Sequence, residues 1–438
     1  MNDSATRTRA AALAMPATAW RTRLVRPRWR AQDDATAATI RALVGSRLIV
    51  WGAALLALAA FGSKAAVASA MDAQHLTRPF HSAIANFVLA PAVRWDSVWY
   101  LAISHHGYTS PESSAFFPLY PMLMHLAAIP FGSALVAGMV ISVVSMTVAL
   151  YLLYLLARLD LSDAQARSTV MLVAFFPTSL FLSAVYTEAL FLVMSVGAIY
   201  AARLDRWAWA GVLAGLAGAT RSGGVLILLP LVLLYLYGPR ERPGVRITWW
   251  RPRYAITRSA AWLAFVPVGL LAYMGYMAVA HHAPFAPFHA EANWGRTYAG
   301  LFSGLVKALA VAPGNLGQGV TGSTWVGGAN DPISLPTHNV IDLVFLAFAV
   351  AGLAFSWRRM PVAYSVYALA LLAQACSYPT ALEPLMSISR FVLVIFPVFM
   401  GWGARLGERP SLNRRALVGS AALLAAFSAL WVTWAWVA

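Results

Sequence analysis

The sequence predicts an all-α protein, a polytopic bundle of transmembrane helices, from three observations. Of its 438 residues, 60% are hydrophobic and only 11% are charged, and the mean hydropathy is +0.66. A chain of this size cannot hide so much apolar surface in one soluble core, so the bilayer must be its solvent. The third observation is a series of apolar runs, separated by short polar segments, that begins near Leu48.

Eleven spans are expected, because a span takes roughly 20 mostly apolar residues. The first 45 residues are expected to form a basic, disordered cytoplasmic tail, and residues 46–438 a single transmembrane domain. The expected spans are 46–68, 133–157, 169–185, 188–203, 207–220, 223–238, 259–280, 339–356, 361–377, 390–405 and 416–437.

Basic residues are unevenly divided between the two sides of this arrangement. With the N-terminus inside, 25 of the 32 Lys and Arg residues lie on the inner side and 7 on the outer side. The positive-inside rule then predicts a multi-pass plasma membrane protein with a cytoplasmic N-terminus. Residues 69–132 and 281–338 become two long outer loops. The stretch 116–131 must lie along the interface or re-enter, since a further span there would invert everything after it.

The composition excludes several other functions. The net charge of +16 is not accompanied by a basic helix, a zinc spacing or an aromatic RNA motif, so we expect no nucleic-acid partner. Cys376 is the single cysteine, which excludes a disulfide or a thiolate metal site within one chain. No Asp-X-Asp or His-X-X-X-His pattern occurs. We therefore expect no metal and no cofactor.

The first outer loop carries a carboxylate between two tryptophans. If residues 94–103 are helical, Trp95 and Trp99 lie one turn apart on one side, with Asp96 and Tyr100 on the neighbouring side. This describes an interfacial helix that is anchored by indoles and displays one carboxylate at the water boundary. The alternative is a juxtamembrane helix in which Asp96 is solvated or paired with Arg94.

Two outward arginines stand beside expected helix N-termini. Arg221 precedes the span that begins near Gly223, and Arg390 opens the span toward Pro397. The free N–H groups and the positive dipole end of a helix favour phosphate, and the guanidinium fork binds phosphate oxygens bidentately. The alternative is that each arginine extends to the lipid headgroups.

A third polar segment joins two apolar spans on the same face. In Tyr186-Thr187-Glu188, Thr187 can cap the next helix and Glu188 can complement its dipole. A carboxylate at that depth is costly, and it could instead bind substrate hydroxyls or pair with Arg221.

These segments together resemble the PIG-V-like mannosyltransferase family, whose eukaryotic members add the second mannose of the GPI anchor. The order and spacing of five stretches carry the resemblance, and each alone would be weak. The stretches are residues 94–108, 116–121, 176–188, 209–221 and 389–397. The sequence departs from the family pattern at Gly223 and Gly224, where one bulkier residue is expected.

The resemblance implies a GT-C-type fold whose first outer loop holds the catalytic carboxylate, here Asp96. It implies an inverting transferase that uses a polyprenyl-phosphate sugar as donor, with Arg221, Arg390 and Arg94 as candidate phosphate ligands. The remaining substrate-site candidates are Trp95, Trp99, Tyr100, Tyr120, Phe176, Pro177, Tyr186 and Glu188.

The acceptor is not named by these residues. Only Lys64 and Lys307 are lysines, and this arginine bias is typical of a high-GC bacterial genome, in which a GPI acceptor is excluded. A cell-envelope glycan, glycolipid or protein is then expected as acceptor. Two other functions stay open: a transporter or flippase of lipid-linked saccharides, and an assembly subunit without an indispensable carboxylate.

Overall fold

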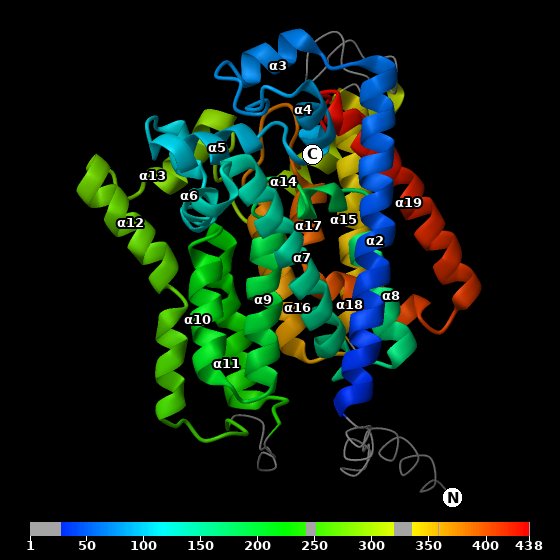
Figure 1. Cartoon of the computed structure of the whole chain (residues 1–438). Helices are drawn as coiled ribbons and strands as arrows, with labels where there is room; N and C mark the ends of the chain where they lie inside the picture. Colours follow the sequence, from blue (N-terminus) through cyan, green and yellow to red (C-terminus); the bar gives the residue numbers. More distant parts are fainter. Residues whose placement is uncertain (1–27, 242–250, 319–334, 358, 438) are drawn as a thin grey trace, which may run out of the picture.

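The computed structural model describes residues 28–241, 251–318, 335–357 and 359–437. Helices linked by turns and loops make up this part of the chain, and no β-strand occurs in it, which confirms the all-α prediction (Figure 1). The helices are α2 (Arg28–Phe61), α3 (Ala65–Met71), α4 (Ala83–Leu89), η2 (Ala90–Ala92), α5 (Ser97–His106), η3 (Glu112–Ala115), α6 (Leu119–Phe131), α7 (Ala134–Arg158), α8 (Asp163–Ala174), η4 (Ser179–Leu182), α9 (Glu188–Arg203), α10 (Trp207–Gly218), η5 (Ser222–Ile227), α11 (Leu228–Tyr237), η6 (Arg258–Phe265), α12 (Val268–His281), α13 (Ala286–His289), η7 (Ala290–Trp294), α14 (Ser303–Gln318), α15 (Leu335–Trp357), α16 (Val362–Ala375), α17 (Ile388–Leu393), α18 (Phe396–Leu406) and α19 (Pro410–Val432).

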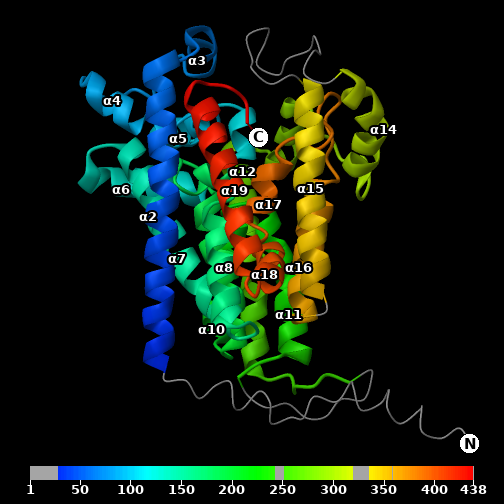
Figure 2. The same cartoon turned by 90° about the vertical axis from the view of Figure 1, so that its right-hand side faces the viewer.

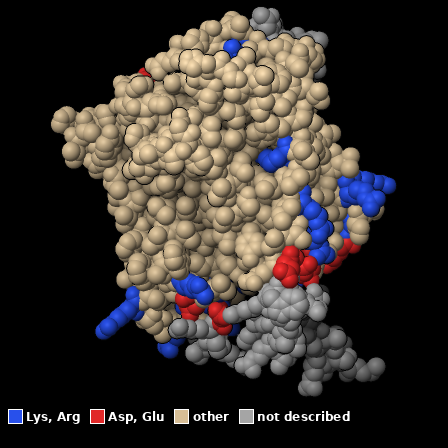
Figure 3. Space-filling model, viewed as in Figure 1, with Lys and Arg blue, Asp and Glu red and all other residues tan. Residues whose placement is uncertain are grey.

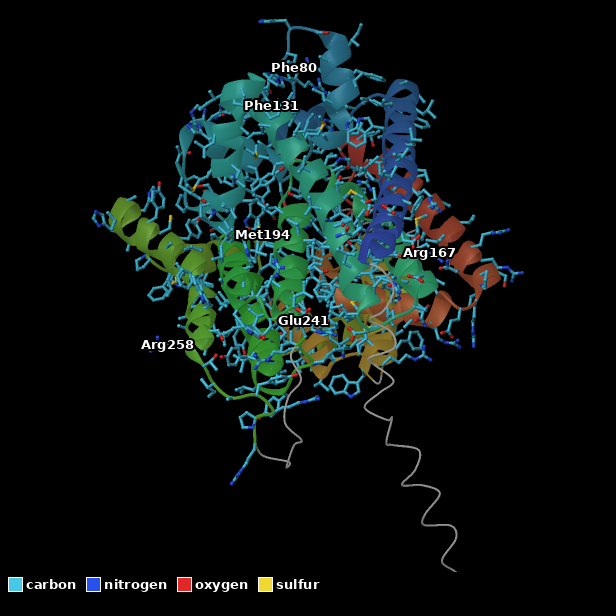
Figure 4. All side chains as sticks on the ribbon, turned by 60° about the horizontal axis from the view of Figure 1, so that its bottom comes forward. Phe80, Phe131, Arg167, Met194, Glu241 and Arg258 are labelled. Atoms are coloured by element: carbon cyan, nitrogen blue, oxygen red, sulfur yellow. The ribbon has the colours of Figure 1, made fainter. Side chains whose placement is uncertain are left out.

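The two long loops expected outside the membrane lie at the same end of the bundle. Helices α3 to α6 of the first loop and α13 and α14 of the second lie at the upper end in Figures 1 and 2. The start of α2 lies at the opposite end, as do the described residues on either side of segment 242–250. Figure 4 likewise places Phe80 and Phe131 far from Glu241 and Arg258. This separation agrees with the expected topology, although residues 242–250 and 319–334 lie outside the described part.

Charged side chains follow the same division. On the face drawn in Figure 3, most Lys, Arg, Asp and Glu side chains gather in the lower half, and the upper half shows only a few isolated charged side chains. A surface of this kind fits a protein whose middle is solvated by hydrocarbon, because a charged side chain there is expensive.

Few helices are long enough to cross a membrane alone. Among the described residues, four helices qualify by length and composition, namely α2, α7, α15 and α19, and the bent pair of η6 and α12 can count as a fifth. The other expected spans are shorter or interrupted. In the expected span 169–185, for example, α8 ends at Ala174 and the chain continues as η4, because Pro177 cannot extend a helix. At 13 residues, α6 is too short to be a further span.

Helix α2 begins earlier than the sequence suggested. The sequence predicts a disordered tail up to residue 45, yet residues 28–45 form the first half of α2. Ala35, Ala38 and Ala42 recur at helical spacing and are almost fully buried. Small residues at this spacing let a helix pack closely against its neighbours, so tertiary packing extends α2 beyond its apolar stretch.

The end of α19 returns to the first loop and fixes it in place. The indole of Trp431 donates to the carbonyl of Pro91 at 3.1 Å, and that of Trp95 donates to the carbonyl of Ala435 at 3.3 Å. Residues more than 300 positions apart in the sequence thus support the segment that contains Asp96.

Candidate active site

A cavity of about 530 Å³ lies between the two loops and the bundle. Both loops contribute to its wall, together with the starts of α9 and η5 and with Arg390 and Phe391 of α17. Its charged residues are Asp96, Glu188, Arg221, Glu291, Arg296 and Arg390, and its aromatic residues include Trp95, Tyr100, Phe116, Phe117, Phe288, Trp294, Tyr378, Phe391 and Trp436.

Asp96, Glu188, Arg221 and Arg390 form one connected network in this wall. Arg390 Nη1 donates to Asp96 Oδ2 at 2.5 Å, and Arg390 Nε lies 3.4 Å from Glu188 Oε1. Arg221 Nη1 donates to the same Glu188 oxygen at 2.9 Å. Four charged groups from four different elements therefore meet, and each offsets part of the cost of burying the others.

Glu188 is the most deeply buried member of the network. Its side chain is 1% exposed, and its second oxygen, Oε2, has no hydrogen-bond partner in the described part of the chain. A buried oxygen without a partner is costly, so this atom is suited to accept a hydrogen bond from a substrate hydroxyl. Of the roles left open for Glu188, the ion pair with Arg221 is present in the structure.

Arg296 adds a third guanidinium that sequence reasoning missed. Its Nε lies 3.4 Å from Glu291 Oε2, and its guanidinium lies 5.0 Å from the ring of Phe391. The guanidinium groups of Arg221 and Arg390 lie 5.2 and 5.8 Å from the same ring. Burial lowers the pKa of Arg296; Glu291 raises it, and the nearby Arg390 and Arg221 lower it further. No motif surrounds Arg296, so only its place on the outer side could have drawn attention to it.

The backbone around Asp96 differs from the predicted helix over residues 94–103. Helix α5 begins at Ser97, with Asp96 at the N-cap position, and Trp95 has a left-handed φ of 51°. The indole of Trp95 therefore turns into the bundle against Trp434 and Trp436. Trp99 points elsewhere and stacks on Phe116. The two tryptophans are not paired membrane anchors, because the turn at Trp95 separates them.

Tyr186 lies directly behind Asp96. The backbone N–H of Asp96 donates to Tyr186 Oη at 3.0 Å, and the guanidinium of Arg390 lies 5.4 Å from the tyrosine ring. Thr187 precedes α9 but makes no side-chain cap, and its hydroxyl pairs instead with Tyr100 Oη at 3.2 Å. The expected capping role of Thr187 is therefore wrong.

Arg94 does not reach the cavity. It is 1% exposed, and it donates from Nε to the carbonyl of Val432 at 2.8 Å and from Nη1 to that of Val93 at 2.7 Å. Its guanidinium is thus committed to the backbone that joins the first loop to α19. Two predictions for Arg94 are therefore wrong: it is not placed to bind phosphate in the cavity, and it does not pair with Asp96.

Five further candidates also lie away from the cavity wall. Tyr120 donates to the carbonyl of Gly138 at 2.9 Å and pairs with Ser142 at 2.8 Å. Phe176 packs on Phe399, with ring centroids 5.0 Å apart. Trp99, Phe176, Pro177 and Tyr186, like Tyr120, are absent from the residues that line the cavity. They shape the surrounding core, and Trp95, Tyr100 and Glu188 are the substrate-site candidates that the structure brings to the wall.

The two glycines after Arg221 allow a close approach of η5 to its neighbours. A Cβ on Gly224 would lie 2.3 Å from the backbone of Ala217, and one on Gly223 would lie 2.9 Å from Leu371. A bulkier residue has no room at Gly224, where the contact is with backbone, whereas at Gly223 the side-chain ends of Leu371 and Gln374 would have to shift. The departure from the family pattern therefore reflects local packing, which holds Arg221 beside Glu188.

Comparison with solved structures finds the oligosaccharyltransferase of Archaeoglobus fulgidus. The structure tethered to an acceptor peptide matches with 14% identity and a TM-score of 0.43, covering 89% of this chain and 55% of that one. The apo form matches with a TM-score of 0.42.

Curated relatives all match over a limited part of the sequence. GPI alpha-1,6-mannosyltransferase 2 of Cricetulus griseus is 33% identical over 146 residues, which cover 30% of this chain and 29% of the relative. The Mus musculus protein of the same name is 29% identical over 201 residues, 42% of this chain and 40% of the relative. GPI mannosyltransferase 2 of Cryptococcus neoformans is 28% identical over 163 residues, 34% of this chain and 38% of the relative. The chain thus spans between about 29% and 40% of the length of these relatives.

A family model matches residues 38–233, a segment that includes Asp96, Glu188 and Arg221 but not Arg390. The resemblance seen in the sequence is thereby confirmed: over this segment the chain is related to the Mannosyltransferase (PIG-V) family.

Proposed function

We propose that this chain is an inverting glycosyltransferase, a mannosyltransferase, that moves a sugar from a polyprenyl-phosphate donor to an acceptor hydroxyl on the outer face of the membrane. The observation that carries the proposal is the position of Asp96 in the wall of a cavity that it shares with three guanidinium groups. A carboxylate and several phosphate-binding groups in one cavity are the parts that this reaction requires.

In the proposed step, Asp96 accepts the proton of the acceptor hydroxyl as its oxygen forms a bond to the anomeric carbon. The bond between that carbon and the phosphate oxygen breaks, and its electron pair leaves with the lipid phosphate. Attack from the face opposite the phosphate inverts the configuration of the sugar. One bond forms, one breaks, and the proton ends on Asp96.

Arg221 and Arg390 receive the leaving phosphate, and Arg296 completes a set of three guanidiniums around Phe391. Charge on the phosphate oxygens grows as the bond breaks, so donors already in place stabilise the transition state more than the ground state. Glu188 Oε2 accepts a hydrogen bond from a hydroxyl of the sugar, and Glu188 Oε1 keeps Arg221 oriented by accepting its hydrogen bond.

No divalent ion is required in this scheme. The leaving group is a single phosphate that three guanidiniums can neutralise, unlike the diphosphate of a nucleotide sugar. The acceptor is a hydroxyl of a glycan, glycolipid or protein. The outer face follows from the basic residues, which concentrate on the inner side of the expected topology.

Transfer is tested with membranes from cells that do or do not contain the protein, supplied with radiolabelled polyprenyl-phosphomannose. We expect the protein to cause label to leave the donor lipid and appear in a covalent product that is stable to mild acid. A labelled nucleotide sugar should give no product when synthesis of the lipid donor is blocked. If label crosses the membrane but stays on the donor lipid, the protein is a transporter or flippase of lipid-linked saccharides and the proposal fails.

A further inference from the structure

A second hollow lies between α8 and α19, toward the end of the molecule opposite the candidate active site. Its volume is about 480 Å³, and no residue that lines it also lines the candidate active site. The hollow exists because α18 runs close to α8 while α19 diverges. Gly407 permits this close approach, since a Cβ there would lie 2.5 Å from Gln165 Cα. The hollow, called the α8–α19 groove, is lined by Ala164, Arg167, Ser168, Met171, Phe175, Gly407, Pro410, Asn413, Arg414, Leu417, Val418 and Ala421.

One part of the groove is polar and positively charged. Arg167 and Arg414 are both exposed, and neither forms an ion pair with any of the described residues. Between them, Ser168 Oγ donates to Asn413 Oδ1 at 2.8 Å, which joins the two helices. Helix α19 begins at Pro410 in the same wall, so the positive end of its dipole faces this part of the groove. Figure 4 shows Arg167 on α8 beside α19.

The other part of the groove is apolar. Met171 and Phe175 of α8 face Leu417, Val418 and Ala421 of α19. Residues 410–421 of α19 rise about 17 Å along the helix. A basic mouth that leads into an apolar wall of this length matches the headgroup and upper acyl chain of one phospholipid.

We propose that the α8–α19 groove binds an anionic phospholipid, with its phosphate between Arg167 and Arg414 and an acyl chain along Met171, Phe175 and Leu417. Charge complementarity selects this occupant. The arginine-rich N-terminal segment of the chain would meet two like charges there, because residues 1–47 hold nine arginines and three acids. Free phosphate would satisfy the arginines but would leave the apolar wall uncovered.

Occupation of the groove has a consequence at the other end of α19. The segment after this helix carries Trp436, which lines the candidate active site and packs edge-on against Trp95 with ring centroids 5.2 Å apart. A lipid that bridges α19 and α8 therefore also restricts the motion of Trp95, the residue before Asp96. This consequence rests on the proposed function, whereas lipid binding itself does not.

Binding is measured on the purified full chain in a neutral detergent. Thermal unfolding is followed while phosphatidylglycerol, phosphatidylcholine or inorganic phosphate is added, and bound lipid is counted by native mass spectrometry. The variants are Arg167→Gln with Arg414→Gln, which remove both charges and keep similar side-chain lengths. The matched control is Arg415→Gln, an exposed arginine adjacent in sequence that does not line the groove.

Phosphatidylglycerol should bind and stabilise the wild type and the Arg415→Gln control. The double variant should bind it about 30-fold more weakly, because each basic residue near an anionic headgroup contributes roughly 1 kcal/mol and a tenfold change corresponds to about 1.4 kcal/mol. Phosphatidylcholine and inorganic phosphate should stabilise all three proteins much less. Equal binding to the double variant, an equal loss in the control, or full stabilisation by phosphate alone would each overturn the proposal.

These outcomes are separable from failure of the proposed function. Lipid binding is read without any sugar donor, so an inactive protein that still discriminates phosphatidylglycerol keeps this inference intact. If the binding difference holds, transfer by the double variant should fall several-fold in vesicles rich in phosphatidylglycerol and should differ little from wild type in phosphatidylcholine vesicles.

Discussion

Two buried arginine–carboxylate clusters lie at opposite ends of this molecule, and they are built differently. At the lower end, Arg203 binds both oxygens of Asp160, at 2.6 and 3.0 Å, and also donates to Tyr364 Oη. At the upper end, Arg390 binds only one oxygen of Asp96, and Glu188 keeps one oxygen without a partner. The lower cluster satisfies its carboxylate, whereas the upper cluster leaves one oxygen without a partner on a residue that lines the cavity.

Under the proposed function, this difference separates a contact that holds the fold together from one that binds substrate. A bidentate pair that is already satisfied gains nothing from a ligand and serves to join the ends of α7 and α9. A network of single contacts can exchange partners, because a phosphate can replace a carboxylate on an arginine at little cost. In the proposed function, the arginines of the upper cluster exchange a carboxylate for a substrate phosphate, whereas the lower cluster keeps its contacts.

The largest expected effect is on transfer by Asp96→Asn. Asparagine keeps the size of aspartate and much of its hydrogen bonding, so the fold should survive, but it is not basic. Loss of a general base typically costs a hundred- to ten-thousand-fold in rate, at unchanged donor binding. Turnover and donor KM are measured in the membrane assay. The control is Glu112→Gln, a carboxylate of the same loop that does not line the cavity. Near-normal transfer by Asp96→Asn together with abolished transfer by Glu188→Gln would move the base to Glu188.

A smaller effect is expected from the arginines of the upper cluster. Arg221→Ala and Arg390→Ala should each weaken donor use about ten- to a hundred-fold, since a hydrogen bond to a charged group contributes roughly 1.5–3 kcal/mol. Lysine at either position should restore only part of the loss, because it keeps the charge but lacks the planar fork. Steady-state kinetics with varied donor measure this. Normal donor affinity in both alanine variants would mean that these arginines only hold carboxylates.

A substitution in the lower cluster should lower the free energy of unfolding and leave the rate of transfer unchanged. Asp160→Asn leaves Arg203 without its carboxylate, and since these side chains are 7% and 12% exposed we expect a loss of about 1–3 kcal/mol in unfolding free energy. Transfer per folded molecule should stay near the wild-type value. Thermal unfolding and active-site-normalised turnover are compared in the same preparation. A loss of turnover without a loss of stability would show that the two clusters do not differ in role.

The two ends should also differ in access from outside the cell. On a Cys376→Ser background, an impermeant thiol reagent added to intact cells should label a cysteine at exposed His75, at the upper end, and not one at exposed Glu241, at the lower end. Permeabilised cells should show labelling at both positions. Labelling at position 241 in intact cells would reverse the orientation and place the cavity inside.

The smallest expected effect is that of metal removal. Excess EDTA should leave transfer unchanged, because guanidinium groups take the leaving phosphate in the proposed step. The rate is measured before and after chelation and after addition of magnesium or manganese. A sharp loss that either ion restores would mean that a divalent ion assists the leaving group.

The sequence by itself determined the class of the protein and the chemistry available to it. Composition and apolar runs require a helical membrane protein, because hydration of so much apolar surface in water is too costly. Local motifs singled out Asp96, Glu188, Arg221 and Arg390, since a carboxylate or an arginine beside a membrane is expensive wherever it occurs.

Only the tertiary structure decided which of these groups meet. Asp96 and Arg390 are 294 residues apart in sequence, and their contact depends on how packing against α15 and α16 positions α17. Arg94 does not reach the cavity, because its guanidinium donates to the backbone of α19. Arg296 does line the cavity, although no sequence motif marked it. Side-chain chemistry is a local property and can be read along the chain, whereas contacts between distant segments are fixed by packing.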